Sequence, residues 1–308
     1  MIHPYATEAY ARSLSHWGEA VHVPEWGCHV IALDTPGALD TPGALNTRGG
    51  KDAAGTYPLA IMSADLDLAG GLERLRRLGM VSVTLVLDEF HRPPLDALRE
   101  HFNVVNPFKA HHIRRNSASF AYGKHHRYEV RRASKQVSVR QFDLGNYLPE
   151  WSSLYADLIR RHGLGGVHEF ASSHFDALNR LQGTTSIGAW LDGKLVSAHL
   201  WVSDGRYVHS HLAASNGEGY GAGAAYAVYD ASVRHFAAAE LLNFGGGAGP
   251  SDDPRDGLSR FKKGFANESA PAYICGAILD EGQYHELVRR RGVPPDTLFF
   301  PAYRARTG

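Results

Sequence analysis

The chain has 308 residues and a formal net charge of zero, a length that suits two domains of about 150 residues each. No apolar stretch approaches the roughly 18 residues that cross a bilayer, and the N-terminus lacks the basic start and apolar run of a secretory signal. Cys28 and Cys275 lie too far apart for a metal or redox motif, so we expect buried thiols in a reducing compartment. These features predict a soluble cytoplasmic protein.

The first third of the chain alternates strand and helix patterns. Three runs have the length and apolar content of strands: 29–33, 57–62 and 81–87. Leucines at helical spacing before Gly79 predict one helix, and Pro93-Pro94 opens another. The hexapeptide Asp-Thr-Pro-Gly-Ala-Leu occurs twice over 34–45, and its turn-forming residues predict an exposed loop over 34–55.

A basic block follows between Lys109 and Arg140. It holds nine lysines or arginines against a single acid, Glu129. Ser119 is placed to cap a helix that continues to about Lys135, after which 137–142 alternates like a strand. Four cations share one face of that helix: Lys124, Arg127, Arg131 and Lys135. In a chain with no net charge this face predicts a phosphate-binding surface, with a solvated helix face as the alternative.

The second half has a distinctive order of elements. A helix around Trp151 ends near Gly163, and Ser173-x-x-Asp176 has the pattern of a helix start. Three strands joined by Asp-Gly hairpin turns are predicted at 185–191, 195–202 and 207–213. A glycine-rich turn over 217–223 then leads into a helix with an apolar stripe. The remaining predicted elements are a strand at 241–244, a short helix at 256–264 and a strand at 273–279.

Four segments carry a resemblance to a known group of enzymes. They are the strand 207–215, Asn243-Phe-Gly-Gly-Gly247, the segment 256–265 that contains Arg-Phe-Lys-Lys-Gly-Phe, and the basic segment 126–133. With the order of elements, they resemble the tandem-domain acyltransferases of the GNAT superfamily, and among these the Fem-like aminoacyl-tRNA-dependent transferases. The likeness extends over roughly residues 57–280.

The resemblance implies an α+β fold of two tandem GNAT-like domains. Each would be a mixed, mostly antiparallel sheet flanked by helices. The N-terminal domain, 1–145, would include the loop 34–55, and the C-terminal domain, 146–308, would carry the donor site.

The same resemblance assigns the central role to Lys262. Amide formation develops an oxyanion on the attacked carbonyl, and a lysine ammonium can stabilise it together with a nearby phosphate. Lys262 matches the lysine that does this in the Fem-like group, although on its own it could be an exposed lysine on a short helix. Neighbouring residues would bind the donor: Gly245, Gly246, Gly247, Arg260, Phe261 and Lys263. Phe261 and Phe265, one helical turn apart, are also expected to pack in the core.

His209 and His211 lie two residues apart on a predicted strand, so they share a face with Tyr207. One of the histidines could act as a general base or bind substrate, with Tyr207 adding a hydroxyl. A pair of satisfied histidines on the sheet is the alternative. No third ligand stands at a helpful spacing, so we expect no metal site.

Glu218 bears on the donor. CoA-dependent GNAT enzymes carry glutamine or arginine at this place in the glycine turn, where backbone N–H groups bind pyrophosphate, and a carboxylate there is unfavourable. The sequence therefore predicts an aminoacyltransferase without a resident cofactor. It would take an amino acid from aminoacyl-tRNA and form an amide on a peptide, a cell-wall precursor or a secondary metabolite. Lys124, Arg127 and Arg131 would help to bind the tRNA.

Two alternatives remain open from the sequence. One keeps the fold and uses an acyl-CoA or a carrier-protein thioester as the donor. The other is a non-catalytic GNAT-like binding protein. Hydrolases are excluded because the chain has neither a phosphate-loop Gly-Lys-Ser/Thr nor a Gly-x-Ser-x-Gly nucleophile motif.

Overall fold

The computed structural model describes residues 2–36, 50–62, 66–249, 253, 255–294 and 296–305. The chain divides into two compact units. Unit 1 comprises Met1–Pro4 and Lys109–Pro271, and unit 2 comprises Tyr5–Phe108 and Ala272–Gly308. This division differs from the predicted boundary at residue 145. The reason is that two long strands, β5 and β11, each pass from one unit into the other.

Unit 2 is built on strands in the order β1-β2-β3-β4-β11. β3 and β4 are parallel, and the other neighbours are antiparallel. The strands are β1 (Glu19–Val23), β2 (Cys28–Asp34), β3 (Lys51–Gly55), β4 (Met80–Leu87) and β11 (Glu268–Ile278). The helices are α1 (Glu8–Ser13), α2 (Leu68–Arg77), α3 (Leu95–His101) and α10 (Glu281–Arg290).

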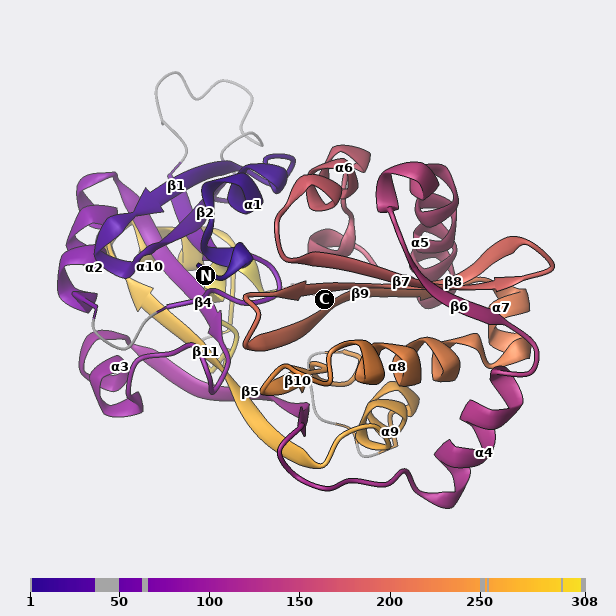
Figure 1. Cartoon of the computed structure of the whole chain (residues 1–308). Helices are drawn as coiled ribbons and strands as arrows, with labels where there is room; N and C mark the ends of the chain where they lie inside the picture. The colour runs from indigo at the N-terminus through magenta and orange to yellow at the C-terminus, as the bar shows by residue number, and fades with distance from the viewer. Residues whose placement is uncertain are drawn as a thin grey trace. The chain divides into compact units, whose positions relative to one another are not determined.

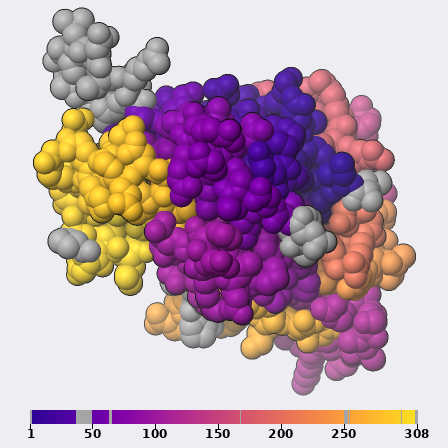
Figure 2. Space-filling model, turned by 90° about the vertical axis from the view of Figure 1, so that its left-hand side faces the viewer, coloured from indigo at the N-terminus to yellow at the C-terminus, as the bar shows by residue number. Residues whose placement is uncertain are grey.

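The C-terminal segment completes unit 2. Phe300 and Tyr303 pack with Val81 of β4 and Tyr284 of α10, and Figure 2 shows the yellow C-terminal residues lying against the purple ones. Gly276 makes this packing possible, because a Cβ at that position would lie 2.3 Å from the ring of Phe300.

Two sequence expectations for unit 2 were wrong. Lys51–Gly55, placed in the predicted loop, is strand β3, whereas 57–62 is irregular. Pro58 cannot donate to a ladder, and only scattered backbone bonds, such as that from Ala60 N to Val86 O (2.8 Å), attach this segment to the sheet. Most of the duplicated hexapeptide falls within 37–49, outside the described residues.

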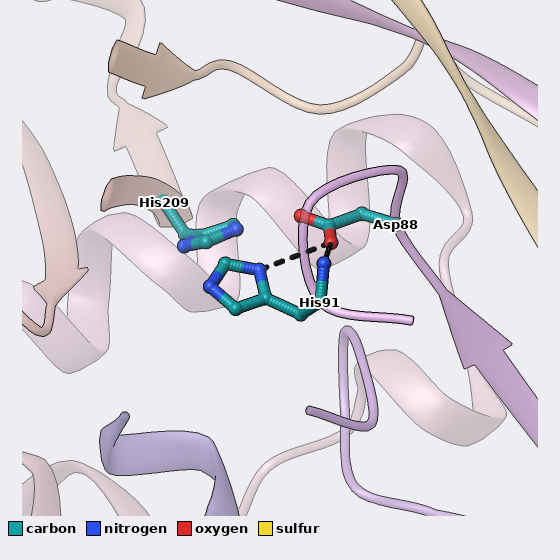
Figure 3. Close-up of side chains that lie close together, drawn as sticks. All are labelled: Asp88, His91 and His209. Carbon is teal, nitrogen blue, oxygen red and sulfur yellow. Dashed lines mark hydrogen bonds and ion pairs between the residues drawn. The ribbon is translucent and has the colours of Figure 1, made fainter. Parts of the chain in front are cut away.

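A buried carboxylate shapes the turn after β4. The Asp88 side chain accepts hydrogen bonds from the backbone N–H groups of Phe90 (3.1 Å) and His91 (2.9 Å). Its Oδ1 also lies 3.0 Å from Nδ1 of His91, as Figure 3 shows. Such a turn satisfies backbone donors that burial would otherwise leave without partners.

Unit 1 has strands in the order β5-β10-β9-β8-β7-β6. β9 and β10 are parallel, and the other pairs of known register are antiparallel. The strands are β5 (Val104–Arg115, in this unit from Lys109), β6 (Ser138–Phe142), β7 (Thr184–Leu191), β8 (Lys194–Ser203), β9 (Tyr207–Ser215) and β10 (Leu241–Asn243). The β7–β8 hairpin turns at Asp192 and Gly193, both with positive φ, as the Asp-Gly pair predicts.

Helices cover both faces of this sheet (Figure 1). α5 (Leu148–His162) and α6 (Ser172–Arg180) lie on one face. α8 (Ala224–His235) lies on the other and packs against α4 (Lys124–Ala133). The core beneath α8 is aromatic and includes Trp201, Tyr229, Phe244 and Phe265. Two short helices, α7 (Gly217–Ala222) and α9 (Gly257–Lys263), flank α8 in the sequence.

The structure corrects three local expectations in unit 1. α4 begins at Lys124 rather than after Ser119, because Tyr122 packs edge-on against Phe265 (5.2 Å) and holds 119–123 out of the helix. The glycine-rich segment predicted as a turn is helix α7, capped by Asn216. α6 begins at Ser172, so Ser173 lies inside it instead of capping it.

None of the helices in the described residues is both long and apolar enough to cross a membrane.

Candidate active site

The site is organised by two parallel strands that part. β9 and β10 pair only from Tyr207–Leu241 to His209–Asn243, after which β9 continues to Ser215 while β10 ends. The chain leaves β10 through Gly245, whose φ of +73° lies in the left-handed region where glycine is favoured. Asn243 Oδ1 accepts the N–H of Gly245 (2.9 Å) and holds this turn. The Gly245–Gly247 backbone thus lies where the two strands separate.

Helix α9 is fastened to that glycine segment by Asp256. The carboxylate caps α9 by accepting the N–H groups of Leu258 (3.2 Å) and Ser259 (2.8 Å), and it also accepts the N–H of Ala248 (2.9 Å). A Cβ on Gly247 would lie 2.4 Å from Asp256 Oδ2, so only glycine permits this contact. The helix N-terminus favours the negative charge of its cap.

The side chains of α9 then separate by role. Phe261 packs against Tyr226 (4.8 Å) and Tyr229 (4.7 Å), as expected for a core residue. Lys262 turns toward the parted strands, and its Nζ donates to Gly246 O at 2.7 Å. Arg260 and Lys263 are exposed. The structure thus brings Lys262 together with Gly245 and Gly246, and it leaves Arg260 and Lys263 at the surface.

The charge on Lys262 is held in an unfavourable environment. Burial, followed by the nearby Lys109 ammonium, lowers its pKa to about 8, against a raising effect of Asp256. Lys109 is itself bound to the glycine segment, donating to Gly247 O (3.0 Å). Lys262 forms no ion pair with any described residue. An ammonium in this state gains by meeting an anion.

A group of buried polar side chains beside Lys262 was not predicted from the sequence. His199 of β8 is 1% exposed; its Nε2 lies 2.8 Å from Ser210 Oγ on β9, and its ring lies 3.9 Å from that of Trp201. Its buried Nδ1 has no hydrogen-bond partner among the described residues. Burial, followed by the charge of Lys262, holds the pKa of His199 well below its usual value, so the ring is neutral. The Ser210 hydroxyl also reaches Tyr229, whose pKa burial raises.

One signal in the sequence could have revealed this group. Once β8 and β9 are paired as a hairpin, Trp201 stands opposite Ser210, and His199 lies two residues along β8 on the same face. A lone histidine within an apolar strand is otherwise indistinguishable from a core residue.

The predicted histidine pair lies elsewhere in unit 1. His209 Nδ1 is 3.1 Å from His3 Nε2, and the His211 ring lies 5.8 Å from that of His174 on α6. Burial holds the pKa of His211 well below its usual value. Tyr207 stands at the start of β9 with the Arg206 guanidinium over its ring (4.8 Å). The catalytic or binding roles of these residues stay predictions.

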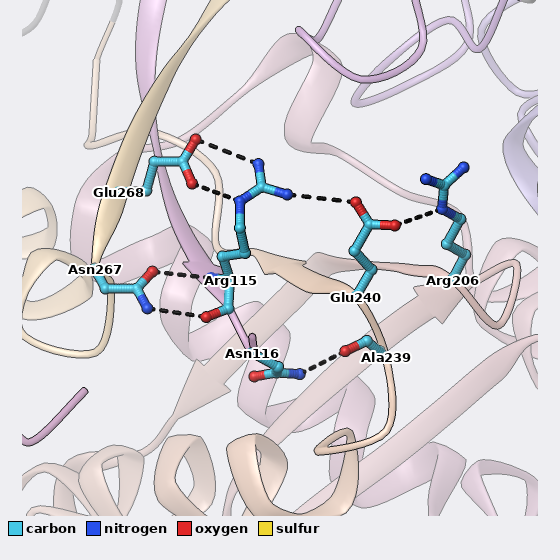
Figure 4. Close-up of polar contacts among 7 residues, drawn as sticks. All are labelled: Arg115, Asn116, Arg206, Ala239, Glu240, Asn267 and Glu268. Atoms are coloured by element: carbon cyan, nitrogen blue, oxygen red, sulfur yellow. Dashed lines mark hydrogen bonds and ion pairs between the residues drawn. The ribbon is translucent and has the colours of Figure 1, made fainter. Parts of the chain in front are cut away.

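The basic block divides into two parts of different character. Arg115 of β5 is neutralised: it binds Glu268 (2.9 Å) and Glu240 (3.3 Å), and Glu240 in turn binds Arg206 (2.6 Å), as Figure 4 shows. On α4, by contrast, the predicted face is exposed: Lys124, Arg127 and Arg131, with Lys135 just beyond the helix. These four form no ion pair with any described residue. Tyr128, 62% exposed, lies beside Arg127 in the sequence.

Neither a protein-family profile nor a curated protein sequence matches this chain. Solved structures do resemble it. FemX aligns with a TM-score of 0.65 at 13% identity, over 92% of this chain and 95% of FemX. The C-terminal domain of a candidate lysylphosphatidylglycerol synthetase from Agrobacterium fabrum gives 0.60 at 12% identity, over 90% and 89%. L-PGS from Bacillus licheniformis gives 0.55 at 11% identity, over 89% and 93%. At these identities the likeness concerns the fold, and it confirms the predicted GNAT-like fold of the Fem type.

Proposed function

We propose that this chain is an N-acyltransferase with Lys262 at the centre of its site. The observation that carries the proposal is the state of that lysine: its ammonium donates to Gly246 O (2.7 Å), burial lowers its pKa to about 8, and no described carboxylate pairs with it. It lies where β9 and β10 separate. The backbone beside it belongs to Gly245 and Gly246, which carry no side chain to cover it. This is the environment in which a fixed positive charge stabilises a developing oxyanion most strongly.

The proposed reaction forms one amide bond and breaks one ester bond. The acceptor amine nitrogen attacks the acyl carbonyl carbon, and the carbonyl oxygen takes up the negative charge facing Lys262. The tetrahedral intermediate then releases the ester oxygen, the nitrogen loses a proton, and the released oxygen gains one. Charge stabilisation and orientation supply the catalysis, so the reaction requires no resident cofactor.

We further propose aminoacyl-tRNA as the donor. The exposed cations of α4, which no described acid neutralises, suit a phosphate backbone. The turn that binds pyrophosphate in CoA-dependent enzymes is replaced here by α7, with the acidic Glu218 in its first turn. Arg132 and Glu129 of α4 lie beside Gly223 at the start of α8. The carboxylates of Glu218 and Glu129 disfavour the pyrophosphate of a CoA thioester at this place. The acceptor is an amine on a peptide, a cell-wall precursor or a secondary metabolite.

The test compares donors directly. Purified protein is incubated with amines from a cell extract and with either radiolabelled aminoacyl-tRNA or radiolabelled acyl-CoA. We expect labelled amide only with aminoacyl-tRNA, and we expect RNase treatment of the donor to abolish it. Product from acyl-CoA would replace the donor proposal with the thioester alternative. No product from either donor would contradict the acyltransferase proposal and favour a binding protein.

A further inference from the structure

The buried face of α4 reaches the helix that carries Lys262. His126, 8% exposed, lies on the side of α4 away from its exposed cations. Its Nε2 is 2.9 Å from the carbonyl oxygen of Phe261, the residue directly before Lys262. The ring also packs against Phe265 (5.0 Å) and Tyr226 (5.3 Å). His126 is therefore a direct bridge between α4 and the last turn of α9.

Gly264 shows how close this approach is. A Cβ at Gly264 would lie 2.0 Å from the Cε1 and Nε2 atoms of His126, far inside van der Waals contact. The φ of Gly264 is −71°, which any residue adopts, so its backbone conformation does not require glycine. The glycine of the Lys-Lys-Gly-Phe segment is required because it leaves space for the imidazole.

The protonation state of His126 suits a fixed hydrogen bond. Burial lowers its pKa, with His125 lowering it further and the Phe261 carbonyl and Glu129 raising it. Two other polar groups pack against the ring, Tyr226 of α8 (5.3 Å) and the neighbouring His125 (5.5 Å). A neutral imidazole carries one N–H, and here it must be on Nε2, because that nitrogen meets a carbonyl acceptor.

We propose that His126 is a positioning residue for Lys262. By donating to the Phe261 carbonyl, it fixes the last turn of α9 and so directs the Lys262 ammonium to Gly246 O. This inference deepens the proposed function, and it rests on it for the roles of α4 and Lys262 in binding the donor. The helix whose exposed face would hold the donor's phosphates also sets, through its buried face, the residue that would meet the donor's carbonyl.

The first test measures the pKa of Lys262 and needs no substrate. Lysine side chains are labelled with acetic anhydride across a pH series, and the extent of labelling at Lys262 is read by mass spectrometry. The variants are His126→Leu, which removes the donor, His126→Gln, which retains an N–H, and His125→Leu as the matched control. His125 is the neighbouring residue of α4 and bonds to Tyr226 (3.2 Å) rather than to α9.

We expect a labelling midpoint near 8 for the wild type and for His125→Leu. In His126→Leu it should rise by about one unit, because a loosened α9 lets water reach the ammonium. His126→Gln should restore most of the wild-type value. The nearby charges Lys109 and Asp256 and the His199 ring are unchanged in all variants, so they do not contribute to the difference. An unchanged midpoint in His126→Leu would overturn the proposal.

Gly264→Ala disturbs the same contact between α4 and α9 by a change on α9. The added methyl displaces the imidazole, and the Lys262 midpoint should shift in the same direction as in His126→Leu. If His126→Leu does not fold, Gly264→Ala provides the test of the proposal. An unchanged Lys262 midpoint in Gly264→Ala would overturn the proposal equally.

Steady-state kinetics test whether the contact between His126 and α9 affects acyl transfer. In His126→Leu we expect kcat to fall about tenfold while KM for the donor changes little, since the exposed face of α4 is intact. Equal loss in His125→Leu would point to general damage to α4 and contradict a specific role for His126. If the wild type transfers nothing, the proposed function fails while the labelling experiment still decides the role of His126.

Discussion

Each unit contains a charged group that is withdrawn from water, fully for Asp52 and partly for Lys262, and the two are held in opposite ways. In unit 2, Asp52 of β3 is 2% exposed and accepts from Arg304 at both carboxylate oxygens (2.7 and 2.8 Å) and from Tyr303 OH (2.9 Å). In unit 1, the Lys262 ammonium donates to one backbone carbonyl among the described residues, and its pKa is lowered by the nearby Lys109 and raised by Asp256. The paired charge fastens the C-terminal segment to the sheet, whereas the lysine pairs with no described carboxylate. Neutralised buried charges indicate structure, and those lacking a counter-ion indicate chemistry.

The largest expected effect is on transfer by Lys262→Met. Removal of the ammonium should lower kcat by about 10³, the effect of deleting an oxyanion-stabilising group. Lys263→Met removes the same charge one residue later, and because Lys263 is exposed we expect a loss of only a few-fold. Steady-state rates with the proposed aminoacyl-tRNA donor measure both. Similar losses in the two variants would mean that α9 acts through its overall charge.

The next effect tests the paired charge. Arg304→Met leaves the Asp52 carboxylate buried without its counter-ion and should lower the free energy of unfolding by about 3 kcal/mol. Urea denaturation at pH 7 measures this. The labelling midpoint of Lys262 should stay near 8, because the two groups belong to different units. A protein of unchanged stability would show that the Asp52 cluster is not what fastens the C-terminal segment.

The third prediction is a gain in stability, opposite in sign to the loss expected for Arg304→Met. The pKa of Lys262 falls from 10.5 to about 8 on folding, so the unfolded chain binds the proton more tightly and the charged lysine opposes folding. Lys262→Met should therefore raise the free energy of unfolding at pH 7 by about 2 kcal/mol. The gain should be complete below pH 8, shrink between pH 8 and 10.5, and vanish above. Urea melts across this range would contradict the assignment if the methionine variant were less stable than the wild type throughout.

The smallest effect extends the comparison to the surface. Arg127→Glu with Arg131→Glu reverses two cations without described partners and should weaken tRNA binding about tenfold at low salt, with a shallower salt dependence. Arg289→Glu with Arg290→Glu makes the same change in charge on α10, where Glu286 already pairs with both arginines. This control should bind tRNA nearly as the wild type does. Equal weakening of tRNA binding in the two double variants would mean that the exposed cations of α4 form a solvated helix face with no specific role in binding.

Elements with local determinants could be predicted from the sequence. The Asp192-Gly193 hairpin and the helix stops at Gly79 and Gly163 depend on positive φ that few residue types supply, and all three appear as expected. Strand β5 was missed because Pro107 and the cations at 109, 114 and 115 do not resemble a strand pattern. Its residues 113–115 pair with β10, a long-range contact that no local pattern encodes.

The candidate site also combines residues that a local motif predicts with residues that only long-range contacts bring together. Lys262 was found because a contiguous motif surrounds it, whereas His199, Ser210 and Tyr229 come from three elements and meet only in the folded sheet. His126 was read as part of a basic helix, and its bond to α9 depends on Gly264, which lies more than a hundred residues away in the sequence. Chemistry encoded in one segment can be predicted from the sequence, but chemistry assembled across segments requires the structure.

The composition of the two units has a consequence for biosynthesis. Unit 1 is a nearly continuous stretch and is complete once Pro271 has left the ribosome, whereas unit 2 combines residues that precede this stretch with residues that follow it. Strand β4 is made early, yet its neighbour β11 pairs with it only after residues up to Ile278 have emerged. During translation the apolar β4 therefore has an open edge until β11 has been made, and such an edge favours aggregation. A strand made after unit 1 thus closes a sheet that was begun before it.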